Sequence, residues 1–303
     1  MAIIGSDGVL AAGKLRWLRA VGWMVALAAA IVIAFNGVAR ATLWAMSAAV
    51  GVDIGAAPAA YKLVAACVGA IAIIALYGVA VRVGERRRVG ELSLRHLPGD
   101  LLLGALVGAA LMAVIVAVLW VCGWVVIAPQ PIERIAIALR DSIRSGVVEE
   151  LLLRLVIFRL LWRAFGVWPA LAMSASLFGL LHLSNPDSSL LAAVSLIAGE
   201  GIGIGLYLIT GRIWAAMGMH AAWNFTQGWL FGAAVSGTTE IAGGPLSLRP
   251  GAGVPELLSG GGFGPEASLA ALIVSFLASA AVLGRAWRRG DFEAADQSLT
   301  GIA

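Results

Sequence analysis

Three short segments of this 303-residue chain place ionisable or amide side chains inside strongly apolar sequence. They run Glu149-Glu150-Leu-Leu-Leu-Arg154, Phe178-Gly-Leu-Leu-His182 and His220-Ala-Ala-Trp-Asn224. Each contains a pair of residues four positions apart, and a helix places such a pair on one face. Ionisable groups at membrane depth are costly, so they mark functional sites by default. We therefore expect three helices to point these pairs into one shared polar site.

The first two segments supply groups that can take a proton from water. Glu150 and Arg154 have the spacing of a helical ion pair, and loss of either partner would strand a charge in lipid. Glu149 lies further around the helix without such a partner, so it is the candidate general base. His182 is the candidate to share or relay the proton. These residues together predict the activation of a water molecule.

The third segment supplies hydrogen-bond donors. His220 and Asn224 lie one helical turn apart, and an oxyanion hole requires such N–H groups when a peptide carbonyl becomes tetrahedral. Phe178, one turn before His182, is expected to pack the site rather than to react. The combined set predicts hydrolysis of a peptide bond within a membrane.

Each motif also has an ordinary structural explanation. A pair such as Glu150 and Arg154 is more often a salt bridge than a catalytic pair. A histidine in an apolar helix often packs through a hydrogen bond, and an asparagine often joins two helices. The distribution of histidine favours a genuine site, because two of the three histidines fall in the motifs and only His96 lies in a basic loop.

The composition is that of a membrane protein. The chain is 61% hydrophobic and 13% charged, whereas soluble domains are typically about 45–50% apolar and about 25% charged. Its basic residues lie at the ends of apolar runs rather than along one stripe, so no nucleic-acid partner is expected. Cys67 and Cys122 lie in apolar runs without a Cys-x-x-Cys pair, which predicts packing residues rather than a disulfide or metal framework.

The apolar runs predict an all-α, polytopic membrane bundle of about eight transmembrane helices. A span needs about 20 mostly apolar residues. The candidates cover residues 21–45, 63–83, 101–127, 146–161, 167–183, 190–209, 213–233 and 269–286. Residues 132–144 are too charged to span, and their apolar residues recur at helical spacing, which predicts an interfacial helix leading into the first motif.

We expect a single membrane-embedded domain over residues 21–287, with a motif core at 95–232 and cytoplasmic tails at 1–20 and 288–303. Residues 232–264 contain ten glycines, which predicts a flexible loop that serves as a linker or as a substrate-gating lid. The stretch from Asp291 to the end is expected to be disordered. The first apolar run also resembles a cleaved secretory signal, but its length and Arg40 at the cleavage position favour an uncleaved span.

The charges of the connecting segments predict a cell-membrane, multi-pass protein with both ends in the cytoplasm. That orientation places 14 basic residues on the inner side, namely Lys14, Arg16, Arg19, Arg82, Arg86, Arg87, Arg88, Arg95, Arg159, Arg163, Arg212, Arg285, Arg288 and Arg289. It places 6 on the outer side, namely Arg40, Lys62, Arg134, Arg140, Arg144 and Arg249. At 1.5 Å per residue, Glu149, His182 and Asn224 lie about 21, about 20 and about 18 Å from the inner ends of their helices. The three motifs should therefore meet at one depth, nearer the outer face.

In this order along the chain, the three motifs resemble those of the CPBP family, also called the Abi family, over roughly residues 95–232. That family contains the type II CAAX prenyl endopeptidases and bacterial bacteriocin-immunity proteins. The resemblance implies an eight-helix, metal-independent intramembrane glutamic endopeptidase without a cofactor. Glu149 and His182 would activate water, His220 and Asn224 would stabilise the oxyanion, and Glu150 and Arg154 would support the site. Family members often have Phe and Gly where this chain has Leu153 and Leu155, a departure that concerns substrate fit more than chemistry.

The substrate is expected to be a protein or peptide in or at the lipid bilayer, whether CAAX-type or a bacteriocin-like peptide in processing or immunity. The oligomeric state stays open. The side of entry is also open, because the depth of the motifs favours the outer face whereas CAAX-type relatives act on cytoplasmic substrates. Three alternatives remain: a zinc protease with Glu149, His182 and His220 as ligands, a transporter or proton relay, and a non-enzymatic scaffold.

Overall fold

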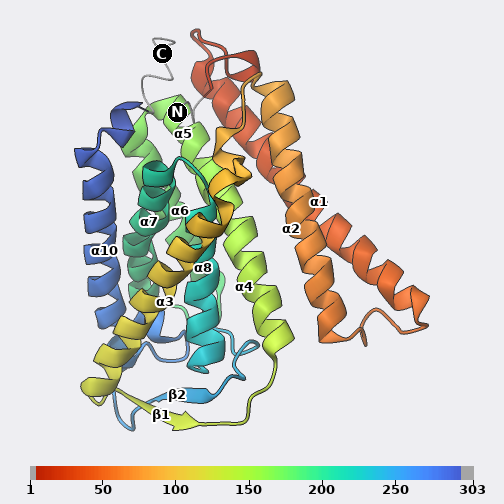
Figure 1. The fold of residues 1–303 in the computed structure, drawn as a ribbon. Helices are drawn as coiled ribbons and strands as arrows, with labels where there is room; N and C mark the ends of the chain where they lie inside the picture. The colour runs from red at the N-terminus through yellow and green to blue at the C-terminus, as the bar shows by residue number, and fades with distance from the viewer. Residues whose placement is uncertain (1–4, 295–303) are drawn as a thin grey trace.

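The protein is described here by a computed structural model over residues 5–294, which form a helical bundle closed at one end by a two-stranded ribbon (Figure 1). Six helical segments of the described chain are long and apolar enough to cross a membrane. They contain α1 (Arg16–Ala49), α2 (Ala59–Gly84), α3 (Leu97–Val121), α6 (Val167–Leu181), α7 (Leu190–Thr210) and α10 (Leu269–Arg288). The expected all-α polytopic membrane class is thus confirmed.

The other two expected spans are helices that carry the first and third motifs. The first is α4 (Ile135–Glu150), which continues through the π-helix η4 (Leu151–Phe158) into α5 (Arg159–Phe165). The second is α8 (Trp214–Phe225), which continues into the π-helix η6 (Thr226–Leu230). Residues 132–144, expected to lead into the first motif, supply most of α4. Length and apolarity alone do not identify these two segments as spans, and both contain π-helix, which often occurs at functional sites.

Short elements complete the described chain. They are η1 (Gly8–Leu10), η2 (Gly90–Leu92), η3 (Leu94–His96), η5 (His182–Ser184), α9 (Glu256–Ser259) and η7 (Pro265–Ala267). The tail that begins at Asp291 is described only as far as Ala294, so most of the expected disordered segment lies outside the described residues.

Two sequence predictions were wrong in the same place. The third span was expected to reach residue 127, but α3 ends at Val121 and Gly123 turns the chain with a φ of 70°. The next residues form β1 (Val125–Pro129), which pairs antiparallel with β2 (Leu246–Pro250). The glycine-rich stretch 232–264 therefore contains a strand and α9 instead of being an irregular loop. The strand partners are far apart in sequence, and that separation hides the pairing from local patterns.

The two ends of the bundle differ in character (Figure 1). The ribbon β1–β2 lies at one end, which we call the ribbon end. The start of α1 and the ends of α2, α5 and α10 lie at the opposite end, which we call the basic end because it gathers arginines such as Arg16, Arg88, Arg163 and Arg288.

Close backbone contact between α3 and α8 fixes the position of the third motif. A Cβ atom at Gly104 would overlap the carbonyl of Ala215, and one at Gly108 would overlap the carbonyl of Met219. Small residues allow membrane helices to approach this closely. The helix that carries His220 is thereby held against α3 by its backbone.

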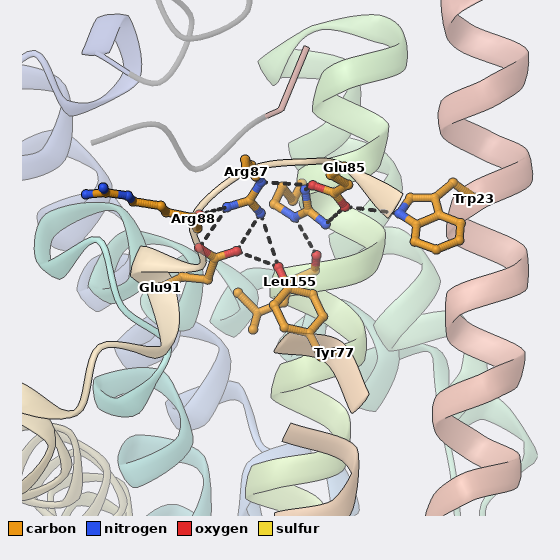
Figure 2. A network of polar contacts seen from close by, with 8 residues as sticks. Trp23, Tyr77, Glu85, Arg87, Arg88, Glu91 and Leu155 are labelled. Atoms are coloured by element: carbon orange, nitrogen blue, oxygen red, sulfur yellow. Dashed lines mark hydrogen bonds and ion pairs between the residues drawn. The ribbon is translucent and has the colours of Figure 1, made fainter. Parts of the chain in front are cut away.

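A buried network of charged residues joins α1, α2 and α5 at the basic end (Figure 2). The Glu85 carboxylate is fully buried and accepts from both terminal nitrogens of Arg159 at 2.6 Å. It also accepts from Arg87 Nε at 2.9 Å and from the indole N–H of Trp23 at 3.0 Å. Burial opposes ionisation of Glu85, but Arg159 and Arg87 outweigh it and lower the pKa of this carboxyl to about 2.

The same network continues to Glu91 in η2. Arg87 Nη1 donates to Glu91 Oε2 at 2.9 Å, and the Tyr77 hydroxyl donates to Oε1 at 2.6 Å. Glu91, like Glu85, is fully buried. We refer to Trp23, Tyr77, Glu85, Arg87, Glu91 and Arg159 as the loop network. It ties the connection between α2 and α3 to the helix that carries the first motif.

Candidate active site

All seven predicted site residues line one cavity of about 530 Å³. They are Glu149, Glu150, Arg154, Phe178, His182, His220 and Asn224. Five helical segments line it, because α7 adds Ser195 and Glu200, and α10 adds Ser275, to the residues supplied by α4–η4, α6 and α8. The structure therefore brings the three motifs together, and their catalytic roles stay predictions.

Arg154 lies between two carboxylates. Its Nε is 2.9 Å from Glu150 Oε2, and its Nη2 is 3.2 Å from Glu200 Oε1. All three residues are at most 4% exposed. On α7, a Cβ atom at Gly203 would overlap the guanidinium, so the absence of a side chain lets Arg154 lie against that helix. The motifs predicted Glu150 as a partner and missed Glu200, whose only sequence signal was a lone carboxylate in an apolar run.

His220 connects the two glutamates of the first motif. Its Nδ1 is 2.8 Å from Glu150 Oε1, and its Nε2 is 3.8 Å from Glu149 Oε2. Glu150 is a carboxylate paired with Arg154, so Nδ1–H donates to it and Nε2 faces Glu149. The Glu149 side chain is 36% exposed, in contrast to its buried neighbour. We refer to Glu149, Glu150, Arg154, Glu200 and His220 as the cavity cluster.

His182 lies where α6 ends and η5 begins. Its Nδ1 is 2.8 Å from the Phe178 carbonyl oxygen. A carbonyl can only accept, so Nδ1 carries the proton and the neutral ring keeps Nε2 as an acceptor. The Phe178 ring meets His182 edge-on at 4.4 Å and lies perpendicular to His220 at 6.3 Å. Phe178 thus has the packing position that its spacing predicted.

Asn224 is oriented by a residue that the motifs did not identify. Its Nδ2 donates to Ser145 Oγ at 2.8 Å, and Ser145 Oγ donates to the Asp141 carbonyl at 2.9 Å. Ser145 lies on α4, one turn before Glu149. This contact links the first and third motifs and leaves the second amide hydrogen of Asn224 available.

Comparison with known protein families agrees with the motifs. Residues 131–226 match the family described as Rce1-like, type II CAAX prenyl endopeptidase Rce1-like. The chain carries an Rce1-like domain. No curated protein and no solved structure matches the chain. The predicted family is confirmed, and the matched residues include all three motifs. The chain is therefore a membrane-integral protein that carries a domain of the CAAX-type peptidase kind.

A wall beyond the matched part of the Rce1-like domain completes the cavity. Val235, Ser236 and Ile241, from the glycine-rich stretch, line it. The buried carboxylate of Glu266 accepts from the Ser236 backbone N–H at 2.7 Å and from Trp223 Nε1 at 3.2 Å. The start of the stretch expected to be flexible is thus fixed at the cavity of the Rce1-like domain by a buried acid.

The cavity also bears on the metal question. Among residues 5–294, no group of three or more histidine, cysteine or acidic side chains is arranged to hold a metal ion. Glu149 and His220, two of the three ligands of the zinc alternative, lie within 3.8 Å of each other. Activity measured with and without a strong chelator tests whether catalysis needs a metal.

Proposed function

We propose that the chain is an intramembrane endopeptidase in which Glu149 and His182 activate water for attack on a peptide bond. One observation carries this proposal: the partly exposed carboxylate of Glu149 and both motif histidines line a single cavity. A general base needs access to the proton that it removes. Glu149 has that access, whereas Glu150 is buried and occupied by Arg154 and His220.

His182 would orient the attacking water. The Phe178 carbonyl fixes the imidazole with Nδ1 protonated, so Nε2 can accept one water hydrogen while Glu149 takes the other. The proton that Glu149 receives is then available to the leaving amine, as general acid–base catalysis requires. Phe178 limits rotation of the ring through its edge-on contact.

His220 and Asn224 would stabilise the oxyanion. His220 already donates from Nδ1 to Glu150, so donation from Nε2 requires the imidazolium form. Two carboxylates near the ring, Glu149 and Glu150, favour that form. Asn224 contributes the amide hydrogen that Ser145 does not engage. The tetrahedral oxygen would then accept one hydrogen bond from each side chain.

The position of the cavity favours entry of substrate from the ribbon end. Asp141 and Arg144, in the ribbon-end part of the continuous helix α4–η4–α5, line the cavity, as do Val235, Ser236 and Ile241. If the basic end faces the cytoplasm, the substrate is a secreted peptide or a membrane-embedded segment rather than a cytoplasmic prenylated protein.

Labelling tests the side of entry. Ser184 and Ser188 follow His182 closely in the chain. Each is replaced by cysteine in a variant from which Cys67 and Cys122 have been removed. An impermeant maleimide should label both positions in intact cells. Labelling that occurs only after the membrane is opened inverts the orientation and favours a cytoplasmic substrate.

The activity itself is tested by comparing membrane peptides from cells that carry wild type, Glu149→Ala or Glu256→Ala. Glu256 is an exposed carboxylate outside the cavity, so its variant is the matched control. We expect a set of cleavage products that is lost only in Glu149→Ala. Identical peptide profiles in all three strains would refute proteolysis, and activity abolished by a strong chelator would favour the zinc alternative.

A further inference from the structure

One buried arginine at the basic end lacks the counter-ion that the others have. The helix α4–η4–α5 carries Arg154, Arg159 and Arg163, each at most 4% exposed. Carboxylates pair with Arg154 and Arg159. Within residues 5–294, Arg163 has no ion pair, and its Nε has no hydrogen-bond partner. Its Nη2 donates to the backbone carbonyl of Leu10 at 2.7 Å. A buried charge left without a counter-ion is costly, so the site favours an anion.

Arg163 borders a second pocket, of about 680 Å³, whose charged lining within residues 5–294 is cationic. Lys14 and Arg16 line it together with Arg163, and no acidic residue of the described part of the chain does. Arg19 donates to the carbonyls of Ala11 and Ala12 at 2.6 and 2.9 Å, which holds the N-terminal segment over this site. Three cations from two distant parts of the chain thus converge on one cavity.

The aromatic residues of this pocket are those of a membrane–water interface. Trp17 and Phe165 line it and are 46% and 44% exposed. Tryptophan is enriched at the level of lipid headgroups. Along α1, the next turns present the exposed apolar side chains Leu18 and Val25, a surface that suits acyl chains.

We propose that this pocket binds the phosphate of an anionic phospholipid. Arg163 and Arg16 would donate to phosphate oxygens with their planar guanidinium groups, and Lys14 would add a third cation. Basic pockets between membrane helices bind acidic headgroups in this way. The general excess of positive charge at one membrane face accounts for the exposed Lys14 and Arg16. It does not account for Arg163, which is buried and has no ion pair within residues 5–294, and this is the observation that favours an anion.

The test measures thermal unfolding of the purified full-length chain in detergent. Dioleoyl-phosphatidylglycerol should raise the unfolding temperature, since a ligand that binds the folded state stabilises it. Dioleoyl-phosphatidylcholine and inorganic phosphate, at equal concentration, should raise it far less. Native mass spectrometry should show phosphatidylglycerol retained on the protein. An equal response to phosphatidylcholine, or a full response to inorganic phosphate, would overturn the lipid assignment.

Variants locate the effect. Arg163→Gln should weaken phosphatidylglycerol binding by about tenfold or more, the size expected for losing a hydrogen bond to a charged group. The double variant Lys14→Gln with Arg16→Gln changes only exposed residues, so it tests the pocket even if Arg163→Gln fails to fold. Arg288→Gln removes an exposed cation from the same end outside the pocket and should bind as wild type does. Unchanged binding by the double variant, or an equal loss in Arg288→Gln, would refute the site.

Discussion

The cavity cluster and the loop network bury the same kinds of side chain but differ in the ratio of acidic to basic groups and in how many polar atoms are hydrogen-bonded. The loop network contains two carboxylates and two guanidinium groups, and every oxygen of Glu85 and Glu91 accepts a hydrogen bond. The cavity cluster contains three carboxylates against one guanidinium and one imidazole. Within the described chain, Arg154 Nη1 and Glu200 Oε2 have no hydrogen-bond partner.

This difference is the one expected between a structural network and the proposed reactive site. A fully satisfied buried network fixes its members and leaves no capacity for a ligand. An excess of carboxylates with unused donors and acceptors beside a cavity can hold an additional proton and bind a polar substrate group. Burial of charge alone therefore does not point to an active site, whereas an excess of carboxylates beside a cavity supports the proposed one.

The sharpest test of this contrast exchanges one glutamate in each region for glutamine. Glu149→Gln should lower peptide cleavage by about 10²–10⁴-fold, the contribution of a general base, with little change in thermal stability. Glu85→Gln should lower stability while leaving the cleavage rate of the folded fraction near wild type. Rates from purified protein and unfolding temperatures in detergent measure both. Full activity in Glu149→Gln would contradict the assigned base.

The next effect concerns Arg154. Arg154→Ala leaves Glu150 and Glu200 without their shared cation, at a cost of about 3–5 kcal/mol for a buried pair. The double variant Glu150→Ala with Arg154→Ala should recover part of that stability. Chemical unfolding in detergent gives the comparison. Unchanged stability in Arg154→Ala would mean that the pair is hydrated rather than buried.

The loop network should give the protein an acid-sensitive component of stability. The pKa of Glu85 falls from 4.5 to about 2 on folding, so its contribution is complete above pH 4.5 and is lost as pH falls toward 2. This change in pKa corresponds to about 3 kcal/mol of the free energy of unfolding. Stability measured from pH 6 to pH 2 should therefore fall more steeply in wild type than in Glu85→Gln. Parallel curves would show that Glu85 keeps the same pKa in both states.

The smallest expected effect is the loss of activity when the hydrogen bond that orients Asn224 is removed. Ser145→Ala removes one neutral hydrogen bond, worth about 1 kcal/mol, which corresponds to a loss of about fivefold in kcat/KM if Asn224 contacts the oxyanion. Ser142→Ala is the matched control, because Ser142 is buried on the same helix without a hydrogen-bond partner for its hydroxyl within the described residues. Equal rates in the two variants would remove Ser145 from the site.

The sequence contained enough information for the motif pairs and the helical class. Pairs four residues apart define a helix face whatever the neighbouring helices do, and long apolar runs define membrane helices. These local rules account for the convergence of Glu149, His182 and His220 in one cavity.

The missed features all depend on distant partners. Glu200 gains meaning only beside Arg154, and Glu85 only beside Arg159. In the sequence alone, nothing distinguishes Arg159 and Arg163 from the cations that flank any membrane span. The pairing of β1 with β2 was not predicted for the same reason, because most of the motif core lies between the two strands in the sequence.

The π-helix η4 affects how the cavity cluster and the loop network are oriented relative to each other. It separates Glu150 from Arg159, and no side chain of the cavity cluster contacts the loop network directly among the interactions described above. Their relative orientation depends on the winding of this helix, where a single residue corresponds to about 100° of rotation in α geometry, and on the backbone hydrogen bond from Ile213, at the start of α8, to Glu91 at 3.1 Å. An insertion or deletion within Leu151–Phe158 would turn one charged region away from its partners while leaving the composition of both intact. The length of this segment is thus as constrained as the identity of the residues at either end.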